Sequence, residues 1–136
     1  AGVSAAVKQT NPNVRVIGVE PVGAAKMTAS LDAGRPVTLD RVASVADGLL
    51  PVRPGDLTFA HVQQFVDEVV TVEDRAIAEA VVWLHRRAKL VVEPSGAASV
   101  AAVRQLGAGV RRPVVAILSG GNMAPDTLAA CVALAG

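Results

Sequence analysis

Two kinds of segment alternate along the chain. Short apolar runs rich in β-branched residues predict buried β-strands over residues 14–20, 69–72, 90–92 and 114–118. Between the runs lie segments of helical composition and periodicity, which predict helices over residues 1–9, 23–33, 57–66, 95–106 and 126–134. Continuously apolar strands that alternate with helices are typical of a parallel sheet covered on both faces. We therefore expect an α/β fold, a three-layer α/β/α arrangement with a mostly parallel sheet.

A further helix is expected after residue 71. Thr71 and Asp74 have the spacing of a capping box, in which each side chain satisfies backbone N–H groups at the start of a helix. The apolar face of this helix holds Ile77, Val81, Leu84 and Ala88. Residues 38–54 contain several prolines and the sequence Asp-Gly, and we expect them to be irregular.

Composition narrows the function classes. The chain has 136 residues, which is one domain's worth, and its net charge of +1 gives no reason to expect a nucleic-acid or membrane partner. No apolar run reaches about 18 residues, so no membrane span is expected. The single cysteine, Cys131, rules out an internal disulfide and favours a cytoplasmic location. His61 and His85 lie far apart with no cysteine cluster, which argues against a zinc site.

Candidate chemistry lies where the predicted strands end. Ligands of open α/β sheets bind beyond the carboxyl ends of the strands. Glu20 ends the first apolar run, Glu93 follows the third, and Ser119 and Gly120 follow the fourth. A serine hydroxyl donates and accepts hydrogen bonds, and a glycine lets the backbone approach a ligand closely. Each of these features alone is equally consistent with an ordinary strand-to-helix connection.

Seven motifs, taken together and in order, are much more specific. They are VIGVEP, SLDAGRPV, VADGL, GDLTF, VDEVVTVEDRAI, KLVVEPSGAASVAA and VVAILSGGN. In this order the chain resembles the C-terminal part of the serine/threonine dehydratases. These are pyridoxal-phosphate enzymes of fold type II, the tryptophan-synthase β-like family, which also includes serine racemase. The resemblance implies that residues 1–136 form a single unit, the C-terminal part of the large cofactor-binding domain.

The resemblance also implies roles for four residues. The serine matching Ser119 hydrogen-bonds the pyridine nitrogen of the cofactor, with Gly120 beside it. Gly48 matches a glycine close to the cofactor, and Glu93 matches a glutamate near the cofactor and substrate. Because a neutral hydroxyl leaves the ring nitrogen largely unprotonated, the ring withdraws electrons weakly, which suits prompt loss of a β-hydroxyl group. The reaction implied is the elimination of water from serine or threonine, giving a 2-oxo acid and ammonia.

A metal site of the family is altered in this chain. Several members bind a divalent cation through an acid, a backbone carbonyl four residues later and a second acid two residues beyond. These positions are Glu20, Ala24 and Lys26 here. Because hard cations need oxygen ligands and a lysine ammonium would repel them, we expect no metal. We expect Lys26 to pair with Glu20 instead.

The resemblance finally bears on completeness and partners. In the family, a glycine-rich phosphate loop precedes the segment that resembles the start of this chain, and the Schiff-base lysine lies further upstream. We therefore expect a fragment that lacks its N-terminal region, contains no catalytic residue and is inactive alone. The expected partners are that N-terminal remainder, a small amino-acid substrate and further copies in a homo-oligomer. Two alternatives stay open, a non-catalytic truncated binding or interaction module and racemase-type activity in the full enzyme.

Overall fold

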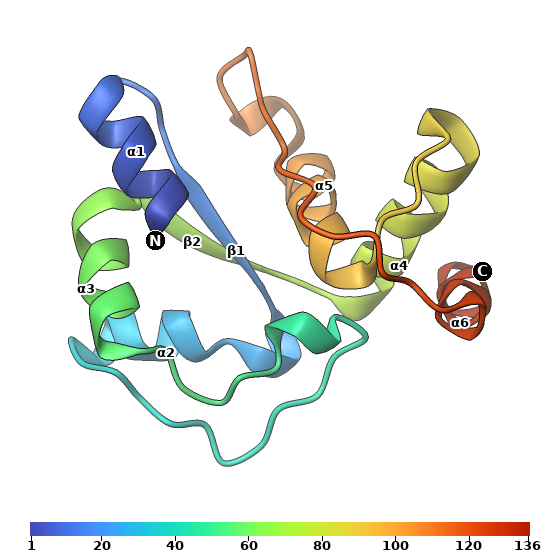
Figure 1. The fold of residues 1–136 in the computed structure, drawn as a ribbon, viewed down its shortest axis with the longest axis horizontal. Helices are drawn as coiled ribbons and strands as arrows, with labels where there is room; N and C mark the ends of the chain where they lie inside the picture. The colour runs from blue at the N-terminus through green and yellow to red at the C-terminus, as the bar shows by residue number, and fades with distance from the viewer.

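The computed structural model describes all residues 1–136, and its centre is a ribbon of two parallel strands (Figure 1). Strand β1 (Ile17–Pro21) pairs with β2 (Glu68–Val72), with Ile17 opposite Glu68 and Pro21 opposite Val72. Between the strands the chain forms a helical turn, η1 (Val22–Ala24), helix α2 (Lys26–Ala33), a long irregular segment and helix α3 (Asp56–Phe65). The parallel pairing and the intervening helices confirm the predicted α/β class.

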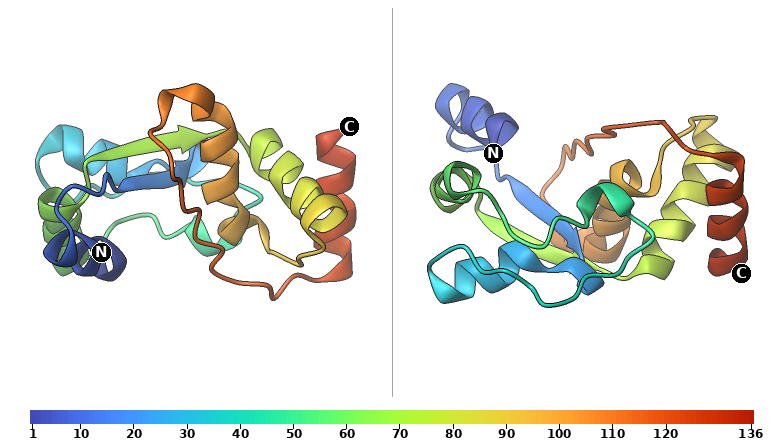
Figure 2. Two further views of the ribbon diagram at one scale, coloured as in Figure 1. Left: turned by 90° about the horizontal axis from the view of Figure 1, so that it is seen from above. Right: turned by 60° about the horizontal axis from the view of Figure 1, so that its bottom comes forward.

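Helices cover the ribbon from different sides. Helix α5 (Pro94–Leu106) packs on both strands, and α2 contacts β2. In Figures 1 and 2, α5 lies on one side of the ribbon and α2 on the other. Helix α1 (Gly2–Thr10) packs on α3 at the far end. Helix α4 (Asp74–Trp83) lies between α5 and α6 (Pro125–Ala135). A wide helical turn, η3 (Leu84–Ala88), extends α4 at its C-terminal end, and a short turn, η4 (Gly107–Gly109), follows α5.

The hydrophobic core lies mainly among α4, α5 and α6. All of its buried residues except Leu84 have small or β-branched side chains, and alanine is the commonest: Ala46, Val72, Ile77, Ala78, Ala80, Val81, Leu84, Val92, Ala97, Ala98, Ala101, Ala102 and Cys131. Alanine lets α4 and α5 approach closely, because its small side chain takes up little space between the two helix backbones. It also has no side-chain entropy to lose on burial. The predicted apolar face of α4 is confirmed except at Ala88, which is exposed.

Two of the predicted strands are wrong. Residues 90–92 and 114–118 form no strand, and the second segment runs as an irregular chain beside α5 (Figure 1). Isolated bonds hold the two segments: the Leu90 N–H donates to the Leu84 carbonyl at 3.2 Å, and the Ser99 hydroxyl donates to the Ile117 carbonyl at 2.8 Å. Just beyond the segments, the Glu93 N–H donates to the Gly120 carbonyl at 3.2 Å. A β-strand needs a run of backbone bonds to a neighbour in register. Residues 91–93 lie beside residues 119–121, but the bond from Glu93 to Gly120 does not extend into a ladder. The predicted burial is also wrong there, since Val115 is 85% exposed.

The predicted capping box of α4 is also wrong. Thr71 belongs to β2, where it lies opposite Glu20, and α4 begins at Asp74 after Glu73. The Asp74 carboxylate accepts hydrogen bonds from the hydroxyl of Ser44 and, at 3.1 Å, from the N–H of Val45. Asp74 therefore holds the long α2–α3 connection against the start of α4, where a negative charge is favourable.

Candidate functional site

The first part of the site is the turn of residues 119–122, which lies against the N-terminus of α5. Glu93 directly precedes this helix, and Pro94 occupies its first position, where the missing N–H of proline costs nothing. The Glu93 N–H donates to the Gly120 carbonyl at 3.2 Å. The Glu93 carboxylate in turn accepts from the N–H of Asn122 at 3.2 Å. Backbone and side chain of one glutamate thus grip the turn at two points.

Two glycines allow this close approach. Gly120 has φ +126°, and a Cβ placed on it would lie 2.5 Å from Glu93 Oε1. Gly96 lies in the first turn of α5, where a Cβ would come within 3.2 Å of the Gly120 carbonyl oxygen and 3.3 Å of the Ser119 carbonyl carbon. A side chain at Gly96 would therefore press on the backbone of the Ser119–Gly120 turn, and a side chain at Gly120 would displace the Glu93 carboxylate.

Gly48 reaches the same helix end from the other side. It lies in the helical turn η2 (Asp47–Leu49), and its N–H donates to the hydroxyl of Ser95 at 2.9 Å. A Cβ on Gly48 would lie 2.9 Å from that oxygen. The structure thus brings Gly48, Glu93, Ser119 and Gly120 together around the N-terminus of α5. Ser95, which joins Gly48 to this group, was not predicted as a site residue; its only sequence signal was its place beside Glu93.

The Ser119 side chain is exposed and forms no hydrogen bond within the chain. Its hydroxyl is therefore available to a ligand. Each of the three lysine ammonium groups, by contrast, already has a hydrogen-bond acceptor within the chain. Lys8 pairs with Asp67 at 2.7 Å, Lys26 donates to the Leu49 carbonyl and Lys89 donates to the Arg86 carbonyl. The site consequently offers a ligand the free Ser119 hydroxyl, the Glu93 carboxylate and nearby backbone groups. No lysine ammonium group bonds any of the four candidate residues.

Glu20 is held away from this site and is fully engaged. It is 4% exposed and accepts from the N–H of Met27 at 3.0 Å, and from the N–H and the hydroxyl of Thr28, both at 2.7 Å. Its carboxylate thus caps the N-terminus of α2, which a negative charge stabilises. The predicted pairing with Lys26 is wrong, because the helix start takes the carboxylate and the Lys26 ammonium bonds the Leu49 carbonyl at 2.9 Å.

The structure contains no group of three histidine, cysteine, aspartate or glutamate side chains placed to hold a metal ion. At the three positions singled out from the sequence, Glu20 is engaged as described, Ala24 is buried and Lys26 carries a positive charge. That this protein binds no metal stays a prediction.

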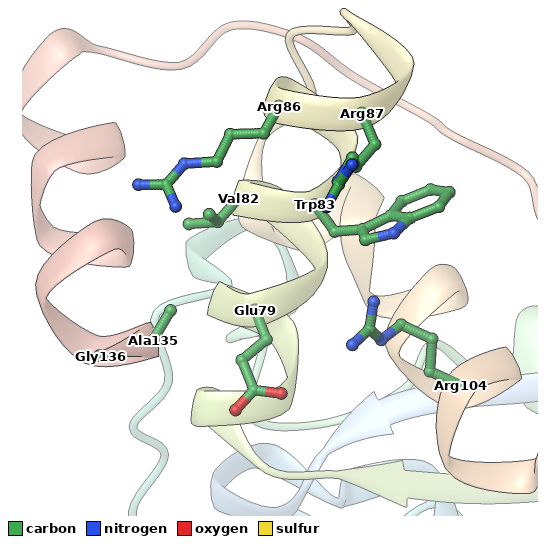
Figure 3. Close-up of a pocket in the computed structure, with 8 residues that line it drawn as sticks. All are labelled: Glu79, Val82, Trp83, Arg86, Arg87, Arg104, Ala135 and Gly136. Atoms are coloured by element: carbon green, nitrogen blue, oxygen red, sulfur yellow. The ribbon is translucent and has the colours of Figure 1, made fainter.

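Two surface hollows lie elsewhere. One, of about 310 Å³, is lined by His85, Arg86, Lys89 and Val91. The other, of about 290 Å³, is drawn in Figure 3, where Trp83 of α4 and Arg87 of η3 extend on the side of Arg104 of α5. Neither hollow contains any of the four candidate residues.

Shifted pKa values also lie outside the site. The pKa of Asp67 is lowered, first by the hydrogen bond from Lys8 and next by the bond from the N–H of Val16. Burial raises the pKa of the Cys131 thiol, so its reactive thiolate form is disfavoured. Asp67 therefore ties α1 to the start of β1, and Cys131 is a packing residue of the core.

With this geometry in place, comparison with known proteins identifies the family. The family model of the pyridoxal-phosphate dependent enzymes matches residues 1–120. The chain belongs to this family. An L-threonine ammonia-lyase of Thermotoga maritima is 42% identical over 90% of this chain and 31% of its own length. A counterpart from Geobacter sulfurreducens is 39% identical over 97% of this chain and 33% of its own length. The chain thus spans about a third of the curated relatives it matches.

Solved structures agree in fold. The processed form of threonine deaminase isoform 2 from Solanum lycopersicum matches with a TM-score of 0.91 and 37% identity, covering 99% of this chain and 40% of that chain. Maize serine racemase matches with a TM-score of 0.85 and 36% identity, covering 97% of this chain and 42% of that chain. The predicted resemblance and fold type II are therefore confirmed. No helix of this family member is both long and apolar enough to cross a bilayer.

The residues present fit one edge of pyridoxal phosphate. The unbonded hydroxyl of Ser119 suits a pyridine nitrogen, which hydrogen-bonds one partner in the plane of the ring. Gly48 and Gly120 are exposed and carry no side chain, so a flat ring could approach their backbone closely. Nothing in the donor set of the four candidate residues fits the aldehyde, because none of the three lysines bonds any of them.

Proposed function

We propose that this chain forms the C-terminal part of the cofactor-binding domain of a pyridoxal-phosphate-dependent L-threonine or L-serine ammonia-lyase. The reaction would remove the β-hydroxyl group as water and release ammonia, leaving a 2-oxo acid. The observation that carries the proposal is the Ser119–Gly120 turn, gripped by Glu93 at the start of α5 with the serine hydroxyl left free. The names of the curated relatives, L-threonine ammonia-lyase and L-threonine dehydratase, support the substrate class.

Each residue would have a distinct part in this reaction. When bound, pyridoxal phosphate supplies an electron-withdrawing ring to the amino-acid substrate. The Ser119 hydroxyl would hydrogen-bond the ring nitrogen without adding a charge, so that nitrogen would keep its lone pair. Gly120 would let the turn lie flat against one edge of the ring. Glu93, whose carboxylate is fixed by the N–H of Asn122, would keep the turn at a constant distance from α5.

The remaining parts would come from the rest of the enzyme. A lysine aimed at the cofactor aldehyde and a cradle of backbone N–H groups for its phosphate are both needed, and we propose that an N-terminal remainder supplies them. A homo-oligomer of the complete enzyme is part of the same proposal. No metal is included, because Lys26 replaces one oxygen ligand.

Complementation tests this proposal directly. Residues 1–136 are expressed alone, and with a matching N-terminal piece of a threonine ammonia-lyase, and both samples receive pyridoxal phosphate and L-threonine. We expect release of 2-oxo acid and ammonia only when both pieces are present, and a loss when Ser119→Ala replaces the parent piece. Specific activity of residues 1–136 alone would refute the division of labour proposed here.

Racemisation is the second candidate activity. The 36% identity with maize serine racemase over 97% of this chain favours it. The same complemented samples discriminate between the two activities when they receive L-serine. Production of D-serine faster than ammonia would favour the racemase, and failure to bind pyridoxal phosphate in any combination would favour a non-catalytic binding module.

A further inference from the structure

Residues 36–54, here called the strap, connect α2 to α3 without a helix or strand longer than the turn η2. In Figure 1 the strap loops out below α2 and returns toward the lower end of α5. It carries Gly48 to the candidate site. A long irregular segment is held in one place only by specific bonds, since it has no regular hydrogen-bond ladder of its own.

Contacts with η1, α2, α4 and α5 fasten the strap. The N–H of Ala43 donates to the Gly23 carbonyl at 2.9 Å. Asp74, at the start of α4, accepts from Ser44 and Val45. The Lys26 ammonium donates to the Leu49 carbonyl at 2.9 Å. Two side chains outside the strap thus bond η2: Ser95 accepts from the Gly48 N–H, and Lys26 donates to the carbonyl of the next residue, Leu49.

Lys26 occupies an unfavourable place for a cation. It is the first residue of α2, where the helix dipole presents positive charge. The Glu20 carboxylate, which caps the same helix end, lowers that cost, and the Leu49 carbonyl receives the partly buried ammonium. A lysine at this position therefore does not stabilise α2, and its bond to the strap accounts better for its presence.

We propose that Lys26 is a positioning residue that fixes η2, so that the Gly48 N–H stays on Ser95 beside Glu93. Leu49 follows Gly48 directly, and its carbonyl is the atom that Lys26 holds. Without that bond, η2 loses its link to α2, and the contact of Gly48 with Ser95 opens more often because it alone then holds η2 to another helix. The proposal rests on the proposed function only in making Gly48 a neighbour of the cofactor.

The experiment uses the protein at its natural length, with Lys26→Met, Lys26→Arg and Lys89→Met. Lys89 is the matched control, because its ammonium also donates to a backbone carbonyl, that of Arg86 at 3.0 Å, away from the strap. Two quantities are measured: amide hydrogen exchange at Gly48 and Leu50, and the Kd for pyridoxal phosphate by titration of cofactor-free protein.

Lys26→Met should speed exchange at Gly48 and weaken cofactor binding, each by about tenfold, the effect of losing one bond of roughly 1.4 kcal/mol. Exchange in α4 and α5 should stay unchanged, Lys26→Arg should restore much of the loss, and Lys89→Met should change neither quantity. Unchanged exchange at Gly48, or faster exchange throughout the protein, would overturn the proposal.

The two proposals fail separately. If the parent protein binds no pyridoxal phosphate while Lys26→Met still loosens Gly48 alone, the proposed function is wrong and the positioning role stands. If the parent binds the cofactor and Lys26→Met leaves Gly48 as it was, the positioning role is wrong and the proposed function stands.

Discussion

Replacing Gly120 with alanine tests the geometry of the site in a single step. The new Cβ would lie 2.5 Å from Glu93 Oε1 and 2.7 Å from Glu93 Cδ, closer than carbon and oxygen approach without a bond. The carboxylate must therefore rotate away and leave the N–H of Asn122. Losing this exposed 3.2 Å hydrogen bond costs about 1 kcal/mol, and an unfavourable positive φ adds about 1–3 kcal/mol. We expect Gly120→Ala to lower the free energy of unfolding by about 3 kcal/mol in total.

Gly34→Ala is the matched control. Gly34 ends α2 with φ +66°, and nothing lies within 4 Å of a Cβ placed on it. Alanine there meets backbone strain alone, about 1–2 kcal/mol. Gly34→Ala therefore measures backbone strain without a steric contact, and a Glu93→Ala background isolates the contact with Glu93.

Urea denaturation of the protein at its natural length measures each free energy. In a Glu93→Ala background the contact is gone, so Gly120→Ala should cost about 1 kcal/mol less than it does beside the glutamate. Equal costs for Gly34→Ala and Gly120→Ala, or equal costs of Gly120→Ala with and without Glu93, would refute the grip that Glu93 has on the turn.

Three further predictions follow from the charges of the chain. Magnesium or calcium should leave the melting temperature unchanged, whereas Lys26→Asp should make the protein respond to either ion, because it restores an oxygen ligand; a clear rise with the parent protein contradicts this. In the complete enzyme, Ser119→Asp should slow elimination by about tenfold, since a carboxylate favours a protonated ring nitrogen, and unchanged kcat would show that Ser119 does not contact that nitrogen. The bond from Lys8 lowers the pKa of Asp67 below 3.8, so its stabilisation is present above that pH and is lost as pH falls through the folded value. Asp67→Asn should therefore flatten the dependence of stability on pH below about 4, and an unchanged acid limb in urea titrations would contradict the assignment.

Local sequence patterns predicted the helices well, since each is decided by contacts within a few residues. The helix predicted over residues 57–66 is α3 (Asp56–Phe65), and the one predicted over 95–106 is α5 (Pro94–Leu106). The apolar runs were less informative. The run at 69–72 is a strand because β1 lies beside it, whereas the equally apolar run at 114–118 has no neighbour in register. Strand formation depends on a partner that the run itself does not encode.

The candidate site shows the same division. Motif resemblance pointed to Gly48, Glu93, Ser119 and Gly120, and the structure gathers all four around one helix end. The bonds that gather them could not be predicted. Lys26 was expected to meet Glu20, which is close in sequence, and instead meets Leu49, 23 residues away. A long side chain can reach several hydrogen-bond acceptors, and only the packed structure shows which of them has no other donor.

The preformed part of the site explains how one segment could serve a larger enzyme. Two residues of this chain set the position of the turn at Ser119. Glu93 bonds the turn, and Gly96, which has no side chain, leaves room for it beside α5. The geometry of this turn therefore does not depend on a strand pairing with residues 114–118. Under the proposed function, the hydroxyl for the ring nitrogen would already be in place when the lysine and the phosphate cradle arrive. A site assembled in this order would lose little conformational entropy at the Ser119 edge on binding its cofactor, because that edge is ordered beforehand.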